Sequence, residues 1–243
     1  MIKIFKFILS VLLLVFTYNI NSQVSGNFKV WHTTEMTDSC EAHYLFVLSE
    51  GYFTKTRYRT DNGGFIQTKG GKFEMMGDSI RFYYEFDSFD KSKASLISTY
   101  YYKENGDQLS LNSARKSRTL KRYDLAGPTS LSGTYLFSGR KEKGEISRRN
   151  TDQPRKTMKI LTGDRFQWIA YNTETGEFFG TGGGTYSATN GKYSEKIEFF
   201  SRNNARVGAK LDFDFDKQGD DWHHSGLSSS EEPIYEIWSL RKK

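Results

Sequence analysis

The 243-residue sequence contains one cysteine, three prolines and no long stretch with a helical hydrophobic period. Because Cys40 is the only cysteine, no intramolecular disulfide can form, and burial and hydrogen bonding alone must stabilise the fold. A free thiol outside the cytosol is exposed to oxidation unless it is buried. His43 is a base close to Cys40 along the chain, but it falls on the opposite face of a strand and so cannot activate the thiol. We therefore expect Cys40 to be an unreactive core residue.

Aromatic side chains are abundant instead. The chain has 15 Tyr, 19 Phe and 4 Trp, which together make up 16% of its residues. Disordered chains lack such side chains, because they cannot offset the entropy lost on ordering, and aromatic residues favour strands over helices. The composition therefore excludes disordered, collagen-like, coiled-coil and polytopic membrane chains, and it predicts a β-rich globular protein.

The N-terminal 22 residues have the pattern of an export signal. Lys3 and Lys6 precede an apolar run over 7–16, which is short for a spanning helix of about 20 apolar residues. We expect a signal peptide over 1–22, with Ser22 at the cleavage edge, and no transmembrane helix in the mature chain; an uncleaved anchor is the alternative. Export predicts a periplasmic or secreted protein of the Gram-negative envelope. Cleavage would lower the net charge from +6 to +4, because the segment holds two lysines and no acid.

The two halves of the mature chain repeat each other at one constant offset, which takes position 71 to position 184 and position 82 to position 195. The matches include Gly71-Lys-Phe73 with Gly184-Thr-Tyr186, and Phe82-Tyr-Tyr-Glu-Phe86 with Glu195-Lys-Ile-Glu-Phe199. Several matches at one offset indicate a duplicated module of ordinary domain size. We predict two domains, 23–125 and 130–243, joined near Gly127.

Each half has the pattern of eight short antiparallel strands. Alternation of apolar and polar residues marks the strands, and Asn-Gly pairs mark the hairpin turns between them. In the second half we expect strands at 132–138, 156–162, 165–171, 178–188, 192–200, 206–216, 221–226 and 234–241. Sequential hairpins of this number fit an up-and-down barrel, which has no exposed edge, and a β-sandwich is the alternative. The predicted fold class is all-β, with two tandem eight-stranded antiparallel barrels after a signal peptide.

Five segments of the second half carry a resemblance to a known family. They are Arg165-Phe-Gln-Trp168, Gly180-Thr-Gly-Gly-Gly-Thr-Tyr186, Lys192-Tyr-Ser-Glu-Lys-Ile-Glu-Phe199, Trp222-His-His-Ser-Gly226 and Glu236-Ile-Trp238. In these segments the chain resembles the lipocalin-like (calycin) domains, in particular those of secreted proteins from Bacteroidota. It departs from the lipocalin pattern at Phe28 and Tyr135, where the first strand would carry Trp. The resemblance implies a barrel with an internal ligand cavity.

The candidate ligand-binding residues gather on inward faces of the second barrel. Tyr193, Glu195, Ile197 and Phe199 share one strand face, so Glu195 is expected to point inward, where a carboxylate needs a partner. The predicted lining is Phe166, Trp168, Tyr186, Tyr193, Glu195, Trp222, His224 and Trp238, with Glu195 and His224 holding a ligand's polar end. The alternative is that these side chains simply fill a small barrel.

Metal-binding and catalytic patterns are weak. His223 and His224 are adjacent on a strand and point to opposite faces, so they cannot chelate one ion, and we expect no metal and no cofactor. The glycine run over 180–184 lies within strand sequence, which indicates a bulge or a sharp bend at a barrel corner rather than a phosphate loop. No nucleophile–base pair is visible, so we expect no enzymatic activity, with acid–base chemistry at Glu195 and His224 as the remote alternative.

A basic segment separates the first two strands of the second half. Residues 139–156 carry seven basic and three acidic side chains. Because the matching connection in lipocalin-like barrels often overhangs the mouth, the resemblance suggests a basic lid over an anionic ligand; a solvated loop is the alternative. The first module is expected to serve as scaffold or partner surface.

These patterns predict an exported, non-enzymatic binding protein, a carrier or sensor of a small hydrophobic, amphipathic or anionic molecule. The alternative is a cell-envelope interaction protein that binds glycan or protein through surface aromatics, with packed barrels and no cavity. Peripheral association with the envelope fits both. Nucleic acid is not an expected partner, because the basic residues are dispersed and export removes the chain from it.

Overall fold

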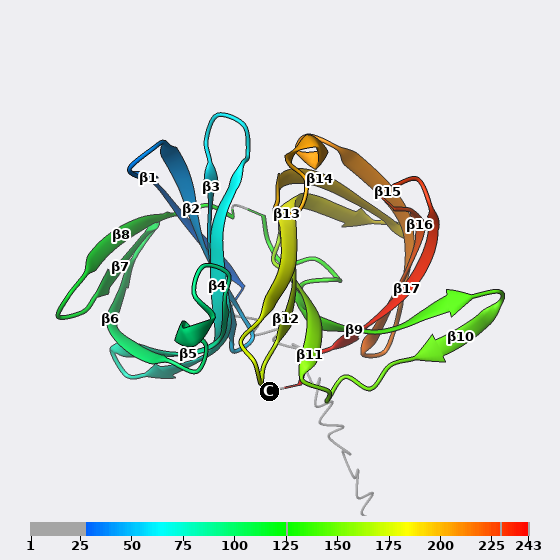
Figure 1. The fold of residues 1–243 in the computed structure, drawn as a ribbon, viewed down its shortest axis with the longest axis horizontal. Helices are drawn as coiled ribbons and strands as arrows, with labels where there is room; N and C mark the ends of the chain where they lie inside the picture. Colours follow the sequence, from blue (N-terminus) through cyan, green and yellow to red (C-terminus); the bar gives the residue numbers. More distant parts are fainter. Residues whose placement is uncertain (1–27, 125, 229, 243) are drawn as a thin grey trace, which may run out of the picture.

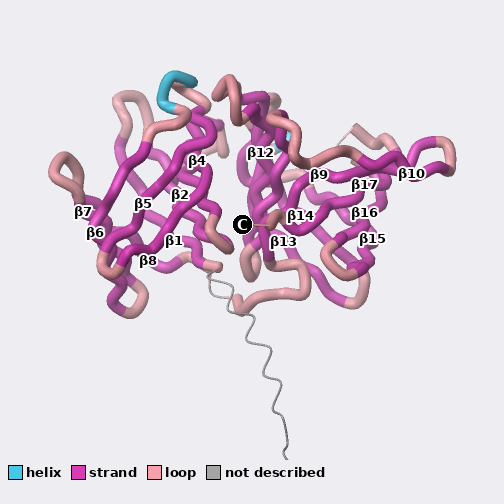
Figure 2. Tube along the Cα trace, turned by 90° about the horizontal axis from the view of Figure 1, so that it is seen from below, coloured by secondary structure: helices cyan, strands magenta, loops and turns pink. Residues whose placement is uncertain are grey.

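A computed structural model describes residues 28–242 except 125 and 229, and within them the chain forms two closed eight-stranded antiparallel barrels in tandem (Figure 1). The all-β prediction and the tandem repeat are confirmed. The predicted signal peptide over 1–22 lies outside the described residues. The two barrels lie side by side, and the C-terminal end of the chain lies between them (Figures 1 and 2).

The first barrel closes by pairing its first strand with its last. Its strands are β1 (Lys29–Met36), β2 (Glu41–Ser49), β3 (Tyr52–Arg59), β4 (Phe65–Met76), β5 (Ser79–Asp87), β6 (Ile97–Asn105), β7 (Gln108–Asn112) and β8 (Ser117–Arg122). Each strand pairs with the next, and β1 pairs with β8. Sequential hairpins thus leave no open sheet edge.

The second barrel repeats this order with one added hairpin strand. Its strands are β9 (Gly133–Glu142), β10 (Glu145–Arg148), β11 (Arg155–Leu161), β12 (Arg165–Asn172), β13 (Phe178–Thr189), β14 (Lys192–Phe200), β15 (Lys210–Gln218), β16 (Asp221–Leu227) and β17 (Pro233–Leu240). Strands β9 and β17 close the barrel, while β10 pairs only with the outer end of β9.

One predicted strand begins too early. The strand expected over 206–216 starts at Lys210, because residues 204–206 form a short 3-10 turn, η2 (Asn204–Arg206), whose cap Asn203 accepts a hydrogen bond from the Ala205 N–H. The first barrel has the same turn, η1 (Lys91–Lys93). Alternation alone did not reveal this turn, since its apolar residues continue the period of the strand.

Cys40 was predicted to lie in the core, and this is wrong. It lies in the turn between β1 and β2, is only partly buried, and its thiol is 3.3 Å from the Thr37 hydroxyl. The turn places it there because Thr37 accepts the Cys40 N–H, which closes the connection between the strands.

A bulge occurs at the same place in both barrels. In β14, Glu198 is an extra residue opposite the Gly183–Gly184 step of β13, and in β5 Glu85 is the extra residue opposite Gly70–Gly71 of β4. The glycine run therefore marks a bulge, as expected. The bulge also reverses the side chains beyond it, so Phe199 does not share the face of Tyr193 and Glu195 as predicted: it points toward the first barrel.

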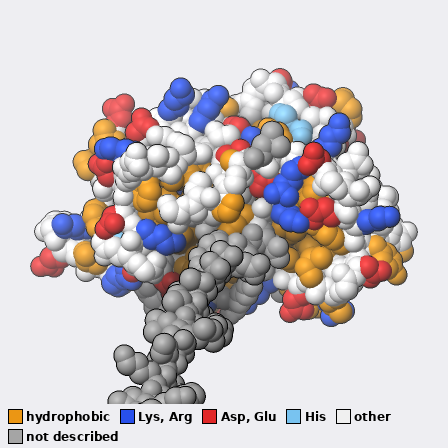
Figure 3. All heavy atoms as spheres, turned by 180° about the vertical axis from the view of Figure 1, so that it is seen from behind, with side chains coloured by type: hydrophobic (Ala, Val, Ile, Leu, Met, Phe, Trp, Pro, Cys, Tyr) orange, Lys and Arg blue, Asp and Glu red, His pale blue; other side chains and the backbone are white. Residues whose placement is uncertain are grey.

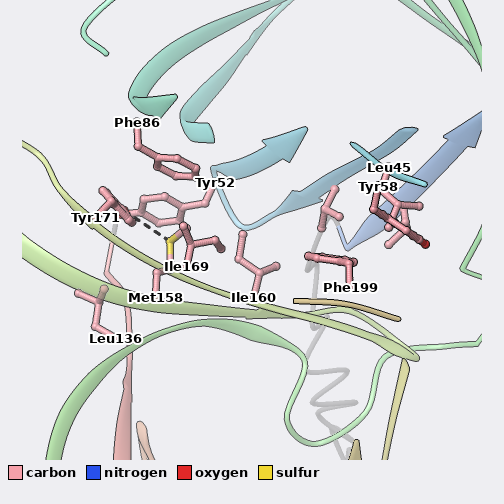
Figure 4. Close-up of a cluster of buried hydrophobic side chains, with 12 residues drawn as sticks. Leu45, Tyr52, Tyr58, Phe86, Leu136, Met158, Ile160, Ile169, Tyr171 and Phe199 are labelled. Atoms are coloured by element: carbon pink, nitrogen blue, oxygen red, sulfur yellow. Dashed lines mark hydrogen bonds between the residues drawn. The ribbon is translucent and has the colours of Figure 1, made fainter. Parts of the chain in front are cut away.

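Each barrel has its own aromatic interior, and a third apolar cluster joins the two barrels. The joining cluster takes six buried side chains from each barrel (Figure 4). Eight of the twelve form pairs of equivalent positions in the repeat: Leu45 and Met158, Val47 and Ile160, Tyr58 and Tyr171, Phe86 and Phe199. The same face of the module thus packs against itself, as in the isologous interface of a two-fold dimer.

Polar contacts across this interface follow the same pseudo-two-fold relation. Tyr58 donates a hydrogen bond to the bulge residue Glu198 over 3.1 Å, and its counterpart Tyr171 donates to the bulge residue Glu85 over 2.6 Å. Arg241, in the C-terminal segment, adds a 2.9 Å ion pair to Glu85. The bulges therefore supply the carboxylates that link the barrels.

A buried amide lies at the centre of the interface. The Gln167 carbonyl accepts hydrogen bonds from the hydroxyls of Thr54 and Thr56, at 2.8 and 3.1 Å. Its amide donates to Thr68 and Thr181, at 3.2 and 3.1 Å. Because every polar atom of the side chain has a partner, the network fixes one relative placement of the two barrels.

Candidate functional site

The second barrel contains a cavity of about 250 Å³ that opens to the surface. Its wall is mostly apolar and includes Trp168, Phe200, Leu211, Phe213 and Ile234. Strand alternation explains the wall, since Leu211 and Phe213 of β15 and Trp168 of β12 occupy inward positions. Phe200 faces inward because the Glu198 bulge reverses the end of β14.

The eight predicted site residues divide into two groups. Five line the cavity: Phe166, Trp168, Glu195, His224 and Trp238. The other three, Tyr186, Tyr193 and Trp222, are buried in the aromatic interior and do not line it. Tyr193 and Trp222 pack edge to face with ring centroids 5.0 Å apart, so this end of the barrel is filled.

Glu195 points inward as predicted, and it has a partner that sequence reasoning missed. Lys159 of β11 lies 3.0 Å from its carboxylate, and the Tyr193 hydroxyl donates to the same oxygen at 2.7 Å. Lys159 and Glu195 are both under a tenth exposed. The pair is thus a buried ion pair, whose desolvation cost is offset by mutual attraction and the tyrosine hydrogen bond.

A second polar group faces the cavity from the closing strands. His224 of β16 is 2% exposed, and neither of its ring nitrogens has a hydrogen-bond partner among the described residues. Its Nδ1 lies 3.5 Å from Glu236, too far for a good hydrogen bond, and Glu236 accepts instead from the Trp238 indole at 3.0 Å. Burial lowers the pKa of His224, so the ring is neutral and offers one donor and one acceptor.

Lys159 and Glu236 are the lining residues with charge that the sequence analysis omitted. The sequence contained a signal for both residues in the alternation of inward and outward positions. Thr157, Lys159 and Leu161 share a face of β11, and Glu236 alternates with Ile234 and Trp238 along β17. A charged residue in an otherwise inward set marks a buried polar group, as it did for Glu195.

The basic segment does not cover the cavity. Residues 139–148 extend β9 into a hairpin with β10 that projects from the side of the barrel (Figures 1 and 2). No residue of 139–156 lines the cavity. The basic segment thus forms a hairpin, and Arg148 at its base pairs with Asp221 at 2.7 Å.

The structure also bears on metal sites, surface charge and membrane-spanning helices. In the part of the chain that the structure describes, no three His, Cys, Asp or Glu side chains cluster as a metal site. On the face seen in Figure 3, basic and acidic side chains are interspersed. Within the described ranges, no helix is long and apolar enough to cross a membrane.

The chain was compared with protein-family models, with curated proteins and with solved structures, and none of the three comparisons gave a match.

Proposed function

We propose that the protein is an exported, lipocalin-like binding protein whose second barrel carries a small amphipathic molecule, without turning it over. The observation that supports this most is the unpaired His224 ring in the wall of a mostly apolar 250 Å³ cavity. A buried polar group without a partner costs roughly 1–3 kcal/mol, which a ligand can recover by hydrogen bonding to it.

The size and charge of the cavity limit the ligand. Its volume of about 250 Å³ is slightly below the roughly 300–1,000 Å³ of pockets for drug-sized molecules, so the ligand is small. Lys159 and Glu195 neutralise each other, which leaves Glu236 as the unbalanced charge. We infer an apolar body against Trp168 and a neutral or cationic hydrogen-bonding end toward His224 and Glu236.

The alternative, a packed envelope protein that binds glycan or protein partners, makes a different prediction for Trp168. In a packed barrel, Trp168→Ala would lower the free energy of unfolding by about 3–5 kcal/mol, as large core truncations do. In a ligand cavity the same substitution mainly weakens binding. The open volume beside Trp168 favours the second outcome.

The experiment is calorimetric titration with 2-naphthol, which joins an apolar double ring to one hydroxyl group. We expect the wild type to bind it, and Trp168→Ala and His224→Phe to bind at least about tenfold more weakly. Phe179→Ala is the matched control, because Phe179 stacks on Arg155 outside the cavity. Equal affinity in all four proteins would place the ligand elsewhere.

A further inference from the structure

The first barrel has a pocket of its own, and its chemistry is different. The pocket has a volume of about 140 Å³, and its lining includes the cationic side chains Lys55, Arg57, Lys69, Lys116 and Arg118. None of the acidic side chains that the structure describes lines it. Tyrosines and one glutamine complete most of the wall, so hydrogen-bond donors surround the space.

Strand alternation brings these charges to the barrel mouth. Phe53, Lys55 and Arg57 are successive inward residues of β3: Phe53 lies in the apolar interior, and the two cations follow toward the opening. Lys69 comes from β4, and Lys116 from the turn before β8. The cations therefore converge from different elements on one space.

Nearby carboxylates neutralise only part of this charge. Glu35 pairs with Arg118 at 2.6 Å and with Arg57 at 3.5 Å. Asp87 lies 3.8 Å from Lys69. Five cations against two carboxylates leave an excess of three positive charges around the pocket.

Lys55 is the strongest sign of a ligand. It is 6% exposed, and no carboxylate of the described chain forms an ion pair with it. Its ammonium lies 3.6 Å from the centroid of the Phe82 ring and donates to the Tyr84 hydroxyl at 3.3 Å. An ammonium has three donors, of which one bonds to Tyr84 and one faces the Phe82 ring, so one remains for a ligand. Burial, with Lys69 and Arg118 nearby, lowers the pKa of Lys55, and an anion bound beside the ammonium would raise it again.

We propose that the mouth of the first barrel binds a small phosphate-type oxyanion, either inorganic phosphate or a phosphate monoester, with Lys55 at the inner end and Arg118 and Lys116 at the rim. A doubly charged oxyanion balances most of the excess charge, and its oxygens accept from several donors at once. The volume of about 140 Å³ equals roughly five water molecules at ~30 Å³ each, which suits a phosphate group.

The site belongs to the first barrel alone. In the register of the repeat, Lys55 corresponds to Trp168, Arg57 to Ala170 and Lys69 to Gly182. The duplicated modules thus differ where it matters for ligand chemistry: one mouth is cationic and the other apolar. The oxyanion site is independent of the function proposed for the second barrel.

The test is calorimetric titration of the full chain with inorganic phosphate, at constant ionic strength set by chloride so that screening stays equal. We expect the wild type to bind phosphate and to gain thermal stability from it. Lys55→Met should bind at least about tenfold more weakly. It should also unfold at a higher temperature than the wild type without phosphate, because it removes a buried cation for which the described part of the chain supplies no counter-ion.

Lys116→Gln is the second variant, since a turn residue can be changed without disturbing the interior. It should bind phosphate several-fold more weakly, and the exposed Lys103→Gln, on β6, should bind as the wild type does. Both Lys55→Met and Lys116→Gln should keep the wild-type affinity for 2-naphthol, which separates this site from the second barrel.

Three results would overturn the proposal. The first is no binding of phosphate to the wild type with a dissociation constant below about 10 mM. The second is unchanged affinity in Lys55→Met, or in Lys116→Gln if Lys55→Met does not fold. The third is tighter binding of acetate than of phosphate, which would make the pocket a carboxylate site.

Discussion

At the scale of residues, several inward positions that carry a charged side chain in one barrel carry an aromatic side chain at the equivalent position of the other. Lys159 and Glu195 form the buried ion pair of the second barrel, and the equivalent positions of the first barrel hold Phe46 and Phe82. Conversely, Trp168 in the wall of one cavity corresponds to Lys55 in the other pocket. The backbone plan was retained, while a few inward positions set the chemistry of each interior.

Replacing one member of the buried ion pair should lower the free energy of unfolding strongly, whereas replacing both members should lower it little. Lys159→Met leaves Glu195 without its cation, so we expect the free energy of unfolding to fall by about 3–5 kcal/mol. The double variant Lys159→Met, Glu195→Leu should recover most of that loss, because both charges are gone. Urea unfolding of the three proteins measures this; a double variant no more stable than the single one would refute it.

Acid should weaken the fold through a pair of histidines in the first barrel. His32 and His43 lie 2.7 Å apart, and burial, with His43 next in effect, lowers the pKa of His32 to about 4 from an ordinary 6.5. Between these values the unfolded chain binds protons that the folded chain does not, so the free energy of unfolding falls as the pH drops from 6.5 to 4. Above pH 6.5 the contribution of this histidine to the free energy of unfolding is fully retained.

Substitutions can show which residue causes this dependence of stability on pH. His32→Gln should flatten the dependence of the melting temperature on pH between 6.5 and 5. His223→Gln is the control, because His223 bonds to Tyr235 away from this pair. If the wild type and His32→Gln show the same slope, the histidine pair is not its source.

At the scale of elements, alternation predicted most strands but not the interruptions within them. The inward positions of Trp168, Glu195 and His224 followed directly from the period of two. The reversal at Phe199 did not, because the extra residue of a bulge is set by strand pairing across the sheet, which one strand's pattern does not contain. The hairpin over 139–148 was missed because its charged residues lack an apolar face.

The bulge glycines should tolerate no side chain. A Cβ on Gly184 would lie 2.0 Å from the Lys196 carbonyl oxygen, which belongs to the backbone and cannot move aside. We expect Gly184→Ala to lower the free energy of unfolding by about 1–3 kcal/mol or more. Gly127→Ala, with no atom within 4 Å of its Cβ, is the control and should change it by less than about 0.5 kcal/mol. Equal stability of the two variants would contradict this reading of the bulge.

At the scale of the whole molecule, the interface between the barrels was the feature least visible in the sequence. Two barrels followed from the repeat, but their contact depends on outward side chains. The continuous apolar run Leu45-Phe-Val-Leu48 was a usable signal, because it indicates a strand buried on both faces. The inward positions of Lys159 and Lys55 could be placed from the alternation. That Lys159 pairs with a carboxylate, whereas Lys55 pairs with none in the described part of the chain, required the closed barrel.

The two barrels should unfold together. They share one apolar cluster and the Gln167 network, so losing either barrel exposes the buried face of the other. We expect one cooperative transition, with Trp31 of the first barrel and Trp222 of the second reporting the same midpoint in single-tryptophan variants. Two separated midpoints would show that the interface does not couple the barrels.

The central claim is that the second barrel carries a small molecule. Native mass spectrometry of the protein, purified gently from its own host, tests it most directly. We predict a mass excess that denaturation releases as one discrete, chemically unchanged small molecule, and that Trp168→Ala lacks. A clean apo mass for the wild type, or a mass excess that Trp168→Ala retains in full, would contradict it.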